Sequence, residues 1–279
     1  MIDTLIVPWQ FGFMRQALVI SLLIAIPAGL LSCFLVLRGW SLMGDAISHA
    51  VLPGVVLAYI IGWSYAIGAF AAGMICAILT GYLAQRSRIK QDTIIGIVFS
   101  GMFALGIVLY IEIQTDIHLD HILFGDILGV NDVDIILTGF ICLCVAGGIL
   151  LRLRDLMLHT FDPMQAKISG LPVGVLHYGL LVGIALTVVA ALKAAGIILT
   201  IGLLIAPGAL AFLLTRRFGI MLFLAVIISV ASCIAGLYAS FYIDSAPAPT
   251  IVLLMAIFFI IVFCFTLYKN RHLGSVDGL

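Results

Sequence analysis

The chain has 279 residues, of which 64% are hydrophobic and 9% are charged, and its formal net charge at pH 7 is zero. Its mean hydropathy is +1.32. Soluble domains carry about 25% charged residues and about half apolar residues. This composition therefore excludes a water-soluble fold and predicts an all-α integral membrane protein, in which helices satisfy the backbone polar groups.

A bilayer core requires about 20 apolar residues per helix, and nine runs of the sequence come near this length. We expect a polytopic bundle of eight to nine transmembrane helices that forms a single domain over residues 1–279. No cleavable signal peptide is expected, because residues 1–13 lack a basic region and a cleavage site. The expected spans are about 14–37, 43–61, 63–85, 92–111, 134–151, 173–192, 195–214, 218–243 and 249–268.

The basic residues indicate the orientation, since Lys and Arg accumulate in cytoplasmic loops. With the N-terminus outside and the C-terminus inside, only Arg15 and Lys193 face out. If the second run, with Pro53 and Gly54, is re-entrant instead of spanning, the N-terminus moves inside and the remaining topology is unchanged. The residues expected on the cytoplasmic side are Arg38, Arg86, Arg88, Lys90, Arg152, Arg154, Lys167, Arg216, Arg217, Lys269 and Arg271.

The second run carries the most informative polar residues, Asp45 and His49, within the segment from Gly44 to Gly54. Residues four apart share one face of a helix. A carboxylate oxygen with an imidazole nitrogen suits Mn²⁺, Fe²⁺ or Zn²⁺ better than Mg²⁺ or Ca²⁺. The pair therefore predicts a metal site on a transport path, toward the inner half of this run. A helix cap at the headgroup level is the alternative.

The loop expected outside, about 112–134, is acidic and contains two carboxylates and two imidazoles in close succession. These residues, Asp116, His118, Asp120 and His121, could collect cations or contact a partner outside the membrane. A solvated acidic loop without a specific ligand is the alternative.

The loop expected inside, about 152–172, contains a short helix with defined ends. Asp162 is a favourable N-cap, Pro163 fits the first helical position, and Gly170 fits the C-terminal end. Such a helix can fit a groove on a soluble partner. A passive interfacial helix is the alternative.

Other conspicuous residues of the apolar runs are expected to have packing or lipid-facing roles. They include the six cysteines, His177, and Pro207 in the small-residue run 196–211, where a kink is expected. No Walker motif, glycine-rich nucleotide loop or nucleophile elbow is present in the sequence. Catalysis within this chain is therefore not expected.

Together these motifs resemble the manganese, zinc and iron ABC permease family over nearly the whole chain. The segment from Gly44 to Gly54 is similar to the family signature, which implies that Asp45 and His49 help to coordinate the ion. Residues 121–128 resemble the start of the span after the outer loop, and 196–211 resemble another characteristic span. The outer loop is most similar to that of the chelated-iron and manganese importers of Gram-negative bacteria.

The inner helix resembles the coupling helix with which ABC importers contact their ATPases, through Gln165, Ala166 and Gly170 after the N-cap Asp162. The resemblance implies an importer permease fold in the bacterial inner membrane, and transport of Mn²⁺, Fe²⁺ or Zn²⁺ into the cytoplasm by alternating access. The implied partners are cytoplasmic ATP-binding subunits, a periplasmic or lipoprotein metal-binding protein, a second or related permease, and membrane lipids. ATP would bind the partner subunit, and neither a permanently bound cofactor nor a nucleic acid is expected.

Three alternatives remain open. A permease for an iron–siderophore or vitamin B12-type ligand would need a wide cavity, whereas an Asp–His pair suits a bare ion. A proton-driven secondary metal transporter would have inverted repeats, which the sequence does not display. A membrane-embedded enzyme is disfavoured because the polar residues within the spans are too few for a nucleophile and a base.

Overall fold

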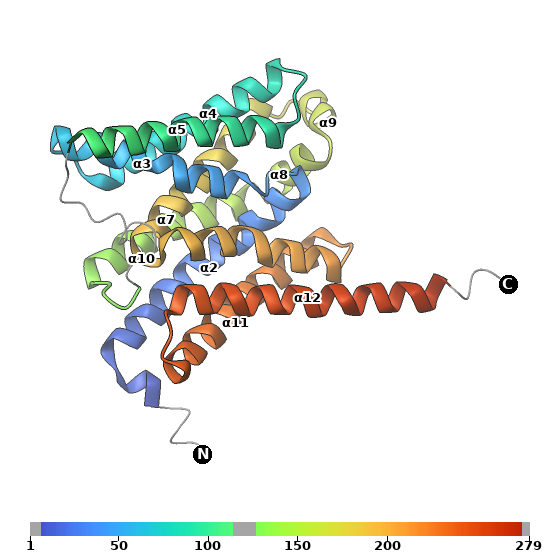
Figure 1. The fold of residues 1–279 in the computed structure, drawn as a ribbon. Helices are drawn as coiled ribbons and strands as arrows, with labels where there is room; N and C mark the ends of the chain where they lie inside the picture. Colours follow the sequence, from blue (N-terminus) through green and yellow to red (C-terminus); the bar gives the residue numbers. More distant parts are fainter. Residues whose placement is uncertain (1–6, 114–126, 275–279) are drawn as a thin grey trace.

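The computed structural model describes residues 7–113 and 127–274, and these form a helical bundle (Figure 1). Within them, nine helical segments are long and apolar enough to cross a membrane, which confirms the expected fold class. The helices are α2 (Gly12–Arg38), α3 (Met43–Ile61), α4 (Tyr65–Arg86), α5 (Gln91–Ile113), α7 (Asp132–Leu151), α8 (Leu153–Phe161), α9 (Pro163–Ile168), α10 (Val173–Leu214), α11 (Phe218–Ile243) and α12 (Pro247–Gly274).

The bundle has two parts joined by α10. One part comprises α3, α4 and α5, which pack against one another, and the other surrounds α2, which packs against α7, α10 and α11. Figure 1 shows α3, α4 and α5 together on one side of the molecule and α11 and α12 on the other. The core around α2 is formed by large apolar side chains such as Ile24, Leu31 and Phe34, all nearly inaccessible.

The second run forms one continuous helix, α3, with the predicted ends Met43 and Ile61. Glycines bring this helix unusually close to its neighbours. A Cβ atom at Gly54 would overlap the carbonyl group of Gly68 in α4, and one at Gly106 in α5 would lie 2.9 Å from the backbone nitrogen of Pro53. Such small-residue contacts are the usual means by which membrane helices approach closely. The continuity of α3 favours a spanning helix over a re-entrant segment.

A glycine also divides α10 into two spans. Gly196 has φ 71° and ψ 178°, a backbone region that is essentially restricted to glycine. An unbroken helix of 42 residues would be about 63 Å long, twice the thickness of the hydrocarbon core. The break yields the spans Val173–Leu192 and Ala195–Leu214, as predicted. Only Gly196 has non-helical dihedral angles in α10, so the division between the two spans lies there. Pro207, where a kink is expected, lies inside the second of these spans.

The cysteines have the predicted packing environments. Cys33, Cys76, Cys142 and Cys233 are buried, whereas Cys144 and Cys264 lie exposed on helices that span the membrane, and all six are free thiols.

Candidate functional site

Small residues at the start of α3 determine which side chains remain accessible there. A Cβ atom at Gly44 would lie 2.9 Å from a methyl carbon of Leu204 in α10. Ala46 and Ala50 are fully buried. Because α3 is closely packed around most of its circumference here, Asp45 and His49 lie on a remaining accessible strip, with side-chain exposures of 30% and 26%.

Asp45 and His49 come together as the sequence predicts. His49 Nε2 lies 3.3 Å from Asp45 Oδ1. Metal–oxygen and metal–nitrogen bonds of about 2.1 Å from these two atoms would meet at an angle of roughly 100°. Adjacent ligands of an octahedral or tetrahedral ion subtend similar angles, so the separation of the two atoms is compatible with a shared ion.

The surroundings of the pair are apolar on one side. The ring centroid of His49 lies 5.9 Å from that of Phe99 and 5.2 Å from that of Phe103, both in α5. The second imidazole nitrogen, Nδ1, is buried and has no hydrogen-bond partner among the described residues. The ring is therefore fixed by packing and by Asp45.

The described part of the chain offers two ligands at this position, Asp45 and His49. Within residues 7–113 and 127–274, no group of three or more His, Cys, Asp or Glu side chains is close enough to hold a metal ion. A transition metal normally has four to six ligands. Ligands from outside the described residues, such as water or a second chain, would supply the others.

The outer-loop candidates Asp116, His118, Asp120 and His121 lie outside the described residues. In the described part of this loop, Asn131 caps α7, and its side-chain oxygen accepts a hydrogen bond from the backbone N–H of Asp134. The amide nitrogen of Gln16 donates to Asp132 at 3.0 Å. Asn131 and Asp132 therefore stabilise the start of α7 and its attachment to α2.

The predicted inner helix is α9. The side chain of Asp162 accepts a hydrogen bond from the backbone N–H of Gln165 at 2.9 Å, and Pro163 occupies the first turn. Gly170 has φ 77°, and its N–H donates to the carbonyl of Lys167. Both ends are therefore fixed by the capping interactions that the sequence predicts.

The side chains that α9 exposes differ from those that the coupling-helix motif suggests. Ala166 is fully buried, so it positions the helix and is not accessible to a partner protein. Gln165 and Gly170 are exposed. Met164 and Ile168, which sequence reasoning missed, are 70% and 78% exposed. Their i, i+4 spacing on a helix that begins at Pro163 is the signal that could have identified them.

A second polar cluster, also missed from the sequence, joins α2, α8 and α10. Arg38 donates to the backbone carbonyl of His159 at 3.0 Å and lies 3.4 Å from Nδ1 of His177. Its guanidinium also stacks over the ring of Trp40, 4.8 Å from the centroid. The three basic residues line a cavity of about 620 Å³ together with Pro163 of α9. The contact at His177 agrees with its predicted packing role.

Comparisons with known proteins are consistent with this architecture. The model of the ABC 3 transport family matches residues 10–266. The chelated iron transport system membrane protein YfeD of Yersinia pestis is 51% identical, over 91% of this chain and 86% of that protein. The manganese transport system membrane protein MntB of Synechocystis sp. is 47% identical, over 92% and 84% of the two chains.

A solved structure is also similar. The structure described as PsaBC from Streptococcus pneumoniae in complex with Fab has a chain that superimposes with a TM-score of 0.80 at 40% identity. The match covers 94% of this chain and 95% of that chain.

Proposed function

The chain belongs to the ABC 3 transport family, and from this membership we propose that it is the membrane permease of an ATP-driven importer for Mn²⁺ or Fe²⁺. The names of its relatives refer to manganese and to chelated iron, which supports these two metals ahead of Zn²⁺. The observation that carries the proposal is the Asp45–His49 pair, with donor atoms 3.3 Å apart on a membrane-spanning helix.

The pair would hold the ion on its path through the bilayer. A carboxylate and an imidazole form a mixed oxygen and nitrogen ligand set that suits these transition metals. Ionisable residues within a span are costly unless they face a cavity, a path or a partner. Because the described residues of one chain supply two ligands, a second copy or a related permease would supply another pair and complete a set of four.

The energy for transport would come from ATP bound by a separate cytoplasmic subunit. The exposed side chains Met164 and Ile168 of α9 would fit an apolar groove on that subunit. A metal-binding protein on the other side of the membrane would deliver the ion. Movement of α9 would then be transmitted to the spans that enclose the Asp45–His49 pair, giving alternating access.

Metal uptake tests the proposal most directly. Cells that lack their own importers would express the chain with its full set of partner subunits, and uptake of radioactive manganese, iron and zinc would be compared. We expect uptake of manganese or iron, and a loss of more than about tenfold in Asp45→Ala and His49→Ala, since each change removes a ligand.

Asp92→Ala is the matched control, since Asp92 is an exposed carboxylate in the first turn of the neighbouring helix α5. This variant should transport normally, and all variants should assemble with the partner subunits. Normal uptake by both Asp45→Ala and His49→Ala would contradict the metal-binding role. Absence of uptake for every metal, despite an assembled complex, would favour a chelated or organic ligand such as an iron–siderophore. Uptake without any ATP-binding subunit would favour a secondary transporter.

A further inference from the structure

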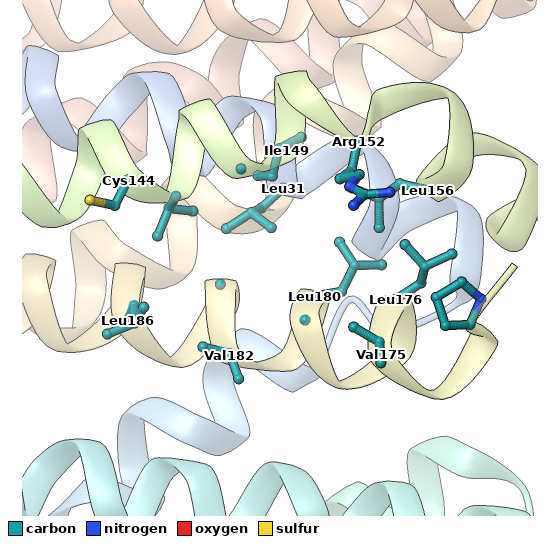
Figure 2. A pocket seen from close by; sticks show the side chains of 15 residues that line it. Leu31, Cys144, Ile149, Arg152, Leu156, Val175, Leu176, Leu180, Val182 and Leu186 are labelled. Carbon is teal, nitrogen blue, oxygen red and sulfur yellow. The ribbon is translucent and has the colours of Figure 1, made fainter.

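A narrow apolar groove lies between α7 and α10, away from the Asp45–His49 pair. Figure 2 shows Cys144 and Ile149 of α7 on one wall and Val182 and Leu186 of α10 on the other. The groove has a volume of about 330 Å³, at the lower end of the range for small-molecule sites, roughly 300–1,000 Å³. Among its lining residues, only Arg152 is polar.

The length of the groove corresponds to one leaflet of a bilayer. Along α7 it extends from Cys144 to Arg152, and along α10 from Val175 to Leu186. At 1.5 Å per helical residue, these distances are about 12 Å and about 16 Å. Half of the hydrocarbon core is about 15 Å thick. An acyl chain that enters at the arginine end would therefore reach the middle of the membrane.

Arg152 gives the groove one charged end, as Figure 2 shows. The residue caps α7, and its side chain is 68% exposed. Its Nη1 donates to Asp155 at 3.1 Å, and the other guanidinium nitrogens have no hydrogen bond among the described residues. Guanidinium groups bind phosphate through several parallel hydrogen bonds. Arg154, also exposed, adds positive charge at the same end.

The floor of the groove is open because it contains glycines. A Cβ atom at Gly148 or Gly179 would meet no atom within 4 Å. Both glycines line the groove and are exposed. The space at this position is therefore not filled by any described side chain of the chain itself.

We propose that this groove binds one anionic phospholipid, with an acyl chain between α7 and α10 and the phosphate at Arg152. Basic residues between membrane helices on the cytoplasmic side attract anionic headgroups, and positive residues at this end of the bundle agree with the predicted orientation. The occupant fits both the apolar walls and the guanidinium N–H groups of Arg152 that Asp155 does not engage, whereas a purely apolar helix from another protein would fit the walls alone.

Lipid binding to the purified full-length chain tests this site. Native mass spectrometry would count bound dioleoyl-phosphatidylglycerol and dioleoyl-phosphatidylcholine over a range of lipid concentrations. We expect the wild type to retain one phosphatidylglycerol at concentrations where phosphatidylcholine is lost. Gly148→Leu, which fills the groove, should weaken binding by about tenfold or more, because several methylene groups lose their contacts. Arg152→Gln should weaken it by about fivefold, the effect of one basic residue on an anionic headgroup.

Two neighbouring positions supply matched controls. Gly147 on α7 also has open space beyond its Cα but does not line the groove, so Gly147→Leu should bind like the wild type. Arg88 is exposed in the α4–α5 turn, and Arg88→Gln should likewise have no effect.

Three results would overturn the proposal. Unchanged binding in both Gly148→Leu and Arg152→Gln would exclude the groove as the site. Equal affinity for the two lipids would exclude recognition of the anionic headgroup. A change of oligomeric mass in Gly148→Leu, with lipid binding intact, would identify the groove as a contact between chains. Arg152→Gln alters an exposed side chain, so the test does not depend on Gly148→Leu folding correctly.

Discussion

At the scale of single residues, His159 has an unusual environment for a titratable side chain. It lies on α8, outside the membrane-spanning segments, and only 3% of it is exposed. Neither ring nitrogen has a hydrogen-bond partner among the described residues. Burial, the positive charge of Arg38 and the nearby His177 lower the pKa of His159 from 6.5 to about 4. The imidazole is therefore neutral at physiological pH.

This lowered pKa predicts a loss of stability in acid. Between pH 6.5 and pH 4 the unfolded chain binds a proton at His159 and the folded chain does not, so the free energy of unfolding falls as the pH falls. The contribution is fully present above about pH 6.5. We expect the thermal unfolding midpoint of the purified protein to drop between pH 7 and pH 5, and to drop less in His159→Gln.

Thr160→Val is the control, because Thr160 lines the same cavity but does not titrate. Its pH dependence should equal that of the wild type. The same acid-induced drop in His159→Gln and in the wild type would show that other groups cause the effect.

At the scale of helices, α9 shows what its sequence determines and what its packing determines. Asp162 and Gly170 fix its ends through local hydrogen bonds. Its orientation depends on the burial of Ala166, which turns Met164 and Ile168 outward. A short helix with two exposed apolar side chains at one end of a membrane bundle is suited to contact a protein partner.

Removal of these two side chains should uncouple the chain from its ATPase. We expect Met164→Ser combined with Ile168→Ser to weaken binding of the purified ATP-binding subunit by about 30-fold, as for a central interface residue. Co-purification and ATP turnover of the complex are the measurements. Val133→Ser, an exposed apolar residue at the start of α7, should behave like the wild type. Normal assembly and turnover in the double variant would exclude α9 as the main contact.

At the scale of the whole molecule, the sequence predicts the architecture well because each span must be a long apolar helix. Both α3 and α11 begin and end at predicted residues, and α12 continues to Gly274 beyond the predicted end at 268. The apolar length of each span, the spacing of the glycines and the four-residue spacing of Asp45 and His49 are local properties of the sequence. They can therefore be recognised without knowledge of the packing. The cluster of Arg38, His159 and His177 could not be predicted, because its members are brought together only by packing of separate helices.

The orientation remains a prediction from the distribution of basic residues, and cysteine labelling tests it. Ser245 lies in the α11–α12 turn, expected outside, and Ser169 follows α9, expected inside. In intact cells stripped of their outer membrane, a membrane-impermeant maleimide should label Ser245→Cys but label Ser169→Cys only after permeabilisation. The unsubstituted chain measures the background labelling of the six native cysteines. The opposite labelling pattern would invert the topology.

The close approach of α3 and α4 limits how the protein can move. At Gly54 and Gly68 the two backbones are in direct contact, and Gly106 of α5 lies against Pro53. Because backbone atoms leave no room for a side chain at these contacts, we expect α3, α4 and α5 to move together. A conformational change that opens a passage beside α3 would then displace this three-helix unit as a whole, and Gly39 (φ 67°) lies in the α2–α3 turn at the start of the unit.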